Sequence, residues 1–313
     1  MRNLAFLLTC VLFLLSGCAG ETAALPSATP EAKETFTPRP SQTSLPQKTS
    51  LPTITVPPSN TPAPSVTAIH IQDPRPLKIS FQTPDGVVLR GYFYPATQNN
   101  APVVVMMHQN NGDQSLWWAE DSGFITWLQN WPSRDGSQPT PSANGALPLL
   151  PAELTFNVMT FDFRGHGESD GEKAQDFSTY LIDAQAAYQA ARTLPAIDPN
   201  KIVGIGTSIG ADAVVNACAE GCLGAFSISP GSWLGTDYGQ SAQALIEAGK
   251  QVRCMYAVND GPSPATCWSI APGNQYQIFS YPGIKHGMTF FVPRKMEADF
   301  GKNIIEFLIE ATK

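Results

Sequence analysis

Charged residues, histidine and long apolar runs are all scarce in this sequence. Asp, Glu, Lys and Arg make up 14% of the 313 residues, the net charge is -7, and only 4 histidines are present. No cluster of basic side chains is available to neutralise phosphate groups, which excludes a nucleic-acid partner. The N-terminal apolar run, Leu4–Leu15, is too short for a helix that spans a bilayer. The scarcity of histidine also leaves few choices for a catalytic base.

The first residues have the layout of a signal peptide. Arg2 precedes the apolar run, and the run ends in Leu-Ser-Gly before Cys18. This L-S-G-C segment resembles the bacterial lipobox, where cleavage would remove residues 1–17 and lipid would be attached to the new N-terminal cysteine. Several acyl chains on one residue hold a protein stably on a membrane. We therefore expect an extracytoplasmic protein, lipid-anchored to the bacterial cell membrane through Cys18. The alternative is an ordinary secretory signal with an incidental cysteine.

A segment rich in Pro, Thr, Ser and Ala extends over residues 18–73. It has too little apolar side-chain surface to offset the entropy that a chain loses on folding, so it is predicted to be a disordered tether. Residues 74–313 are then the folded domain, because about 240 residues are enough to bury a core.

The folded domain contains the cysteines Cys218, Cys222, Cys254 and Cys267. An even number of cysteines in an exported protein indicates disulfides. Among the possible pairings we predict the local one, Cys218–Cys222 together with Cys254–Cys267. No histidine lies near either pair, which disfavours a metal site. The sequence implies no metal ion and no organic cofactor.

Strands and helices alternate along this domain. Short apolar or alternating runs predict strands at 77–83, 87–94, 102–107, 156–161, 201–205, 223–229, 251–258 and 275–280, and helical patterns cover 115–128, 175–192, 241–248, 294–311 and a segment that begins near 209. A Pro-Asp-Gly turn joins the first two strands into a hairpin. The predicted fold class is α/β, with a doubly wound, mostly parallel sheet, an N-terminal antiparallel hairpin, and functional loops at the carboxyl ends of the strands.

The most informative stretch is Lys201–Val215, which reads KIVGIGTSIGADAVV. It predicts a buried strand, a sharp G-x-S-x-G turn and a helix. A tight strand-to-helix turn holds its central residue in a strained conformation, and side chains two residues away on either side would collide with it. Ser208 is therefore the predicted nucleophile, at the carboxyl edge of the sheet. The backbone N–H of Ile209 lies next to it at a helix N-terminus, where it can stabilise an oxyanion.

A serine nucleophile needs a base, and the base needs a carboxylate to orient it. In a sheet of this kind the order along the chain is serine, acid, histidine. His286 follows the last predicted strand and is the predicted base. Asp260 follows the strand before it and is the predicted acid, with Asp237 as the alternative. The second oxyanion donor is expected after the strand that ends at Met107, from the backbone N–H of Gln109.

These pieces together resemble the α/β-hydrolase family, and most of all its dienelactone-hydrolase-like and prolyl-oligopeptidase-like serine esterases and peptidases. The matching motifs are VVVMMHQNNG, FDFRGHGESDG, GIGTSIGA, VNDG and KHG, in the order and spacing of the family. The resemblance implies Ser208 as nucleophile, Asp260 as acid and His286 as base, with Gln109 and Ile209 as oxyanion donors. The family usually has His-Gly where this chain has His108-Gln109, so a bulky side chain is expected to border the pocket here.

The expected function is cleavage of a carboxylic ester by a surface-tethered serine hydrolase through an acyl-enzyme. The predicted partner is a small ester or acyl substrate. Alternatives are a serine peptidase of the same fold and a non-catalytic surface binding protein. Aromatic rings at the strand ends could line an apolar or sugar-stacking pocket. Ordinary packing is the expected role, with the pocket as the alternative, for Trp117, Trp118, Trp127, Trp131, Trp233 and Trp268.

Overall fold

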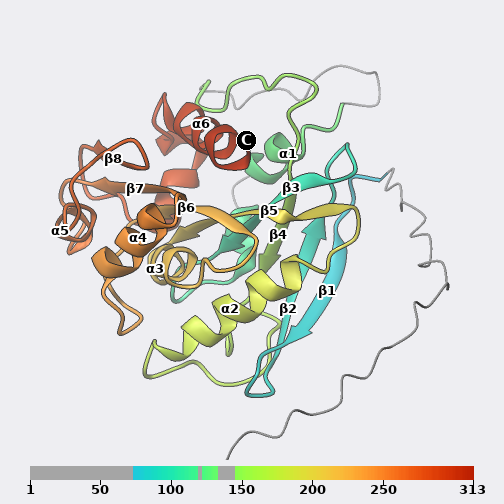
Figure 1. Cartoon of the computed structure of the whole chain (residues 1–313), viewed down its shortest axis with the longest axis horizontal. Helices are drawn as coiled ribbons and strands as arrows, with labels where there is room; N and C mark the ends of the chain where they lie inside the picture. Colours follow the sequence, from blue (N-terminus) through green and yellow to red (C-terminus); the bar gives the residue numbers. More distant parts are fainter. Residues whose placement is uncertain (1–72, 119–121, 133–144) are drawn as a thin grey trace, which may run out of the picture. The chain divides into compact units, whose positions relative to one another are not determined.

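A computed structural model describes residues 73–118, 122–132 and 145–313 (Figure 1). The predicted signal peptide, Cys18 and the tether, apart from Asp73, lie outside the described residues. Across the described ranges, every helix is too short or too polar to cross a bilayer.

The described part of the chain forms an eight-stranded sheet in the order β1-β2-β4-β3-β5-β6-β7-β8. The hairpin partners β1 and β2 are antiparallel, β2 pairs antiparallel with β4, and all other neighbours are parallel. The strands are β1 Leu77–Gln82, β2 Val88–Tyr94, β3 Ala101–Met107, β4 Asn157–Phe161, β5 Ile197–Thr207, β6 Cys222–Ile228, β7 Gln251–Ala257 and β8 Tyr276–Tyr281. The predicted fold class is confirmed.

Helices cover both faces of this sheet (Figure 1), because its central strands are apolar on both sides. Along β3, Val103 and Val105 enter one hydrophobic cluster and Val104 and Met106 enter the other. The first cluster is completed by α2 (Thr179–Ala191), α3 (Ile209–Asn216), α4 (Tyr238–Glu247) and α5 (Ser263–Cys267), and the second by α1 (Phe124–Gln129) and α6 (Phe300–Thr312).

Several helix boundaries differ from the predicted ones. The C-terminal helix was expected from Arg294 but begins at Phe300, since the preceding residues form the 3-10 turns η3 (Gly287–Phe291) and η4 (Pro293–Lys295). These turns bury Phe290 and Phe291 in the core. The helix expected over 115–128 is replaced by a 3-10 turn, η1 (Gln114–Trp117), and by α1, which follows a glycine with a φ of 66°.

Both predicted disulfides are present. Cys218–Cys222 joins the end of α3 to the start of β6, with Cα atoms 5.3 Å apart. Cys254–Cys267 joins β7 to α5, with Cα atoms 5.7 Å apart. The second disulfide encloses the loop that carries Asp260 and braces it from both ends.

Candidate active site

Ser208 lies between the end of β5 and the start of α3, in the strained conformation that the motif predicts. Its φ is 54° and its ψ is -118°, a region that non-glycine residues rarely adopt. A side chain on Gly206 would overlap the carbonyl of Gly210, and one on Gly210 would overlap the carbonyl of Met107. Both glycines are thus required by close backbone approach. At Gly206 the contact is within the turn, as the sequence predicts, whereas at Gly210 it is with the neighbouring strand β3.

Asp260 and His286 meet at the same edge of the sheet, because they follow the neighbouring parallel strands β7 and β8. Their closest atoms, His286 Nδ1 and Asp260 Oδ1, are 2.7 Å apart. The carboxylate is buried, whereas the His286 side chain is 40% exposed. The alternative acid, Asp237, instead caps the N-terminus of α4, where its carboxylate accepts the N–H of Gln240.

One cavity of about 550 Å³ brings the predicted site residues together. Ser208, Asp260 and His286 line it, and so do both predicted oxyanion residues. Its wall is completed by Asn110, Asn111, Phe177, Trp233, Gly261 and Pro262. The cavity therefore holds a hydroxyl, an imidazole–carboxylate pair and two backbone amides next to apolar and amide side chains.

Gln109 and Ile209 line this cavity, and within the described ranges no hydrogen bond of either backbone N–H to another group is found. Ile209 is the first residue of α3, where the helix itself supplies no acceptor. Two unpaired donors at the wall beside Ser208 suit a developing negative charge on oxygen.

His108 holds the loop that carries Gln109. The Phe163 N–H donates to His108 Nε2 at 3.1 Å, so the ring proton is on Nδ1, which donates to the Gln109 carbonyl at 2.8 Å. The ring is fully buried, and this burial lowers the pKa of His108 to about 3. His108 is therefore a neutral positioning residue and not a second base.

The pKa of His108 makes stability depend on pH. Unfolding returns the imidazole to its ordinary pKa of 6.5, so between pH 6.5 and about 3 the unfolded chain binds a proton that the folded one does not. We expect the stability of the wild type relative to His108→Asn to fall as pH decreases through this window, by roughly 5 kcal/mol in total. Urea titrations followed by circular dichroism at a series of pH values test this. Parallel pH curves for the two proteins would contradict it.

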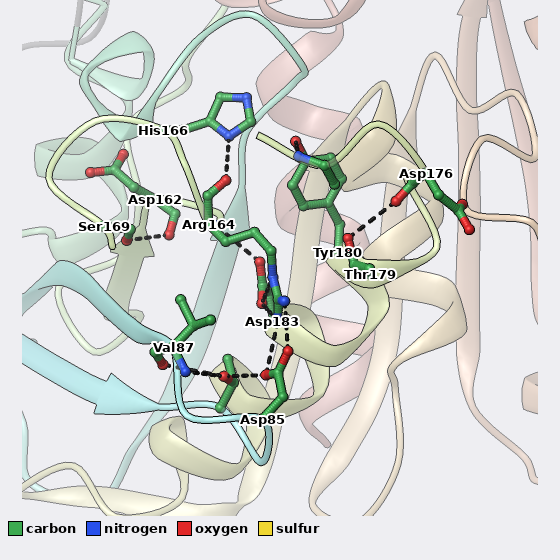
Figure 2. Close-up of polar contacts among 12 residues, drawn as sticks. Asp85, Val87, Asp162, Arg164, His166, Ser169, Asp176, Thr179, Tyr180 and Asp183 are labelled. Carbon is green, nitrogen blue, oxygen red and sulfur yellow. Dashed lines mark hydrogen bonds and ion pairs between the residues drawn. The ribbon is translucent and has the colours of Figure 1, made fainter. Parts of the chain in front are cut away.

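The segment after β4 is held by a network of hydrogen bonds next to the site. Asp162 accepts the backbone N–H groups of Gln114 and Glu168, at 2.7 Å and 2.9 Å. Figure 2 shows His166 Nδ1 pointing at the Arg164 carbonyl, 3.0 Å away. Asp162, Arg164 and His166 do not line the cavity of Ser208.

Asp212 is a residue that sequence reasoning missed. It lies on α3, one turn after Ser208, fully buried. Its carboxylate accepts the N–H groups of Gly231 and Trp233, and burial raises its pKa to about 7. It fixes the backbone of the loop that places Trp233 in the cavity wall. An acidic residue one turn after the nucleophile was the available signal.

Ordinary packing, the expected role of the tryptophans, accounts for Trp117 and Trp127. Both are buried in the core on the α1–α6 face of the sheet. Trp117 packs edge-on against Phe291, with ring centroids 5.0 Å apart. Trp268 is largely exposed and donates to the Tyr256 hydroxyl. These three tryptophans do not line the cavity of Ser208, whereas Trp233 does.

Comparison with known proteins gives a partial sequence match and a match of the fold. The family model described as serine aminopeptidase, S33, matches residues 152–256. An uncharacterized protein of Escherichia coli, YfhR, is 27% identical over 147 residues, which are 46% of this chain and 42% of that protein. The quorum-quenching protein AidA of Acinetobacter baumannii is 30% identical over 149 residues, which are 46% of this chain and 40% of that protein. The matched part thus spans about two fifths of these relatives.

Two solved structures match most of the folded domain. The Pyrococcus furiosus esterase Pf2001 gives a TM-score of 0.52 at 17% identity, over 76% of this chain and 94% of that one. Est1E of Butyrivibrio proteoclasticus, solved with ferulic acid bound, gives a TM-score of 0.51 at 16% identity. The match covers 74% of this chain and 98% of that one. At these identities the likeness concerns the fold.

Proposed function

We propose that this chain, which has the α/β-hydrolase fold, is a serine hydrolase that cleaves carboxylic esters. The observation that carries the proposal is the strained Ser208 in one cavity with the hydrogen-bonded pair of Asp260 and His286. A strained serine next to an imidazole–carboxylate pair is what nucleophilic acyl transfer requires, whereas a binding module needs none of the three.

The mechanism follows from the roles of these groups. Ser208 Oγ attacks the ester carbonyl while His286 Nε2 takes its proton, and His286 Nδ1–H donates to Asp260. The carbonyl oxygen becomes an oxyanion that accepts the N–H groups of Gln109 and Ile209. The alcohol leaves with the proton from His286. Water then attacks the acyl-serine by the same steps and releases the acid.

The cavity favours a neutral substrate. No Lys or Arg side chain lies among its described lining residues, and the carboxylate of Asp260 is already paired with His286. Phe177, Ile209 and Trp233 offer apolar surface for an acyl or aryl group. Uncharged aliphatic or aromatic esters are therefore the substrates that this site suits best.

Peptide cleavage is the second candidate, favoured by the match of residues 152–256 to the serine aminopeptidase model. Both reactions use the same nucleophile, so the substrate decides between them.

We also propose, from the sequence alone, that lipid on Cys18 anchors the protein outside the cytoplasm. Mass spectrometry of the mature N-terminus tests the anchor, since a mature chain without lipid on Cys18 would exclude it.

The test of the proposed function compares p-nitrophenyl esters, from acetate to dodecanoate, with aminoacyl p-nitroanilides. We expect the esters to be turned over at least about tenfold faster than the anilides, as kcat/KM, because the cavity has no carboxylate free to bind an α-amino group. Faster turnover of the anilides would favour the peptidase. Inertness toward both, with no labelling by a fluorophosphonate, would leave a binding function.

A further inference from the structure

Gln109 uses its side chain as well as its backbone. The side-chain oxygen Oε1 accepts the N–H of Met288 at 2.9 Å and so links the loop after β3 to η3. A side chain on Gly287, whose φ is 50°, would overlap this oxygen. The Gly287 N–H in turn donates to Ser229 Oγ at 2.9 Å. The Gln109 amide is thus fixed against the residue that directly follows His286.

Gln109 lines two cavities. The first is the cavity of about 550 Å³ that Ser208 and His286 line. The second, of about 260 Å³, is lined by Leu116, Met288, Thr289, Phe291, Val292 and Lys295. Gln109 is the residue that the linings of both cavities share. The second cavity therefore adjoins the reactive one at Gln109.

We propose that the Gln109 side chain is a specificity-determining partition, which closes the reactive cavity toward the second one and limits the length of the ester's acyl chain. The inference rests on the proposed function. A long acyl chain would have to pass the place that the Gln109 amide occupies before it could reach the apolar surface of Leu116 and Phe291. The hydrogen bond to Met288 N–H holds the amide in that place, because moving it would leave a backbone donor unpaired.

The experiment is an acyl-length series of p-nitrophenyl esters, measured as kcat/KM for wild type, Gln109→Ala and Gln109→Met. Removal of the side chain in Gln109→Ala should raise the ratio of long-chain to short-chain kcat/KM by about tenfold or more. Gln109→Met separates the bulk of the side chain from its anchoring, because methionine has a similar length but cannot accept the Met288 N–H. Its length ratio should rise less than that of Gln109→Ala, because the bulk remains although the anchoring hydrogen bond is lost.

A second substitution tests where the long chain goes. Leu116→Trp should fill the second cavity and cancel the gain of Gln109→Ala when the two are combined, yet leave the length ratio of an otherwise wild-type protein unchanged. A gain that survives Leu116→Trp, or a length ratio that Leu116→Trp alone lowers, would overturn the proposal. Thermal unfolding of each variant verifies that it is folded.

The two proposals fail in different ways. If the wild type hydrolyses no ester, the proposed function fails. If the wild type is active and Gln109→Ala has the same length ratio, the partition is disproved and the esterase assignment stands. If Gln109→Ala does not fold, Gln109→Gly is the variant that removes the side chain between the two cavities. The single variant Leu116→Trp still tests whether the second cavity is closed in the wild type.

Discussion

Replacement of Ser208 by alanine should lower kcat for ester hydrolysis by about four to six orders of magnitude. The variant loses the only atom that forms the acyl-enzyme in the proposed mechanism, while the backbone N–H groups of Gln109 and Ile209 remain. The small residual rate should come from these donors and from binding alone. Stopped-flow or long-incubation assays with p-nitrophenyl acetate measure the difference, and a fluorophosphonate should label the wild type only.

Two further variants show whether the three residues act as a unit. His286→Ala should cost nearly as much as Ser208→Ala, and the double variant hardly more than either. Asp260→Asn should cost about 10⁴-fold, because an amide can hold the His286 ring with the wrong nitrogen protonated. A double variant whose loss of activation free energy equals the sum of the losses of Ser208→Ala and His286→Ala would contradict a shared mechanism.

Ser263→Ala is the matched control for this series. Ser263 is a buried serine at the start of α5, close in sequence to Asp260, and its hydroxyl has no hydrogen-bond partner within the described ranges. Its loss removes a hydroxyl near the acid loop without removing an interaction. We expect its kcat/KM to stay within about twofold of the wild type. A loss comparable to that of Ser208→Ala would show that serine replacement in this region acts through folding.

The second large effect concerns stability, at the ion pair of Arg164 and Asp183 (Figure 2). The fully buried Asp183 carboxylate accepts Arg164 Nε at 2.8 Å, Nη2 at 2.7 Å and the backbone N–H at 2.9 Å. Removal of Asp183 leaves the nearly buried guanidinium of Arg164 with only the partly exposed Asp85 as an ionic partner. We expect Asp183→Ala to lower the free energy of unfolding by about 3–5 kcal/mol in urea titrations.

Asp85 provides the comparison for this pair. It binds the same guanidinium, at 2.7 Å, but its side chain is 41% exposed, so water can replace it. Asp85→Ala should therefore cost about 1 kcal/mol or less. The double variant Arg164→Met, Asp183→Leu should recover much of the loss, since it removes both charges together. Equal stabilities of Asp183→Ala and Asp85→Ala would contradict the importance of burial here.

The sequence predicted the reactive groups because their positions depend on local geometry and on chain order. The G-x-S-x-G turn allows few backbone conformations, and Gly206 is required by a contact within the turn. Asp260 and His286 follow adjacent parallel strands, and the carboxyl ends of such strands share one edge of the sheet. The disulfides were predictable because each joins cysteines that are close in sequence.

What only the tertiary structure decided are the partners of side chains that are distant in sequence. Gln109 accepts from Met288, 179 positions away, and no local pattern encodes that pairing. The capture of the Trp233 N–H by Asp212 is equally non-local, at a separation of 21 positions. Trp117 is an aromatic residue of the kind that can line a pocket, but it packs in the core because the fold brings Phe291 beside it. Backbone geometry is set by neighbours in the chain, whereas the shape and limits of a cavity are set by residues that meet only when the sheet and its loops are assembled.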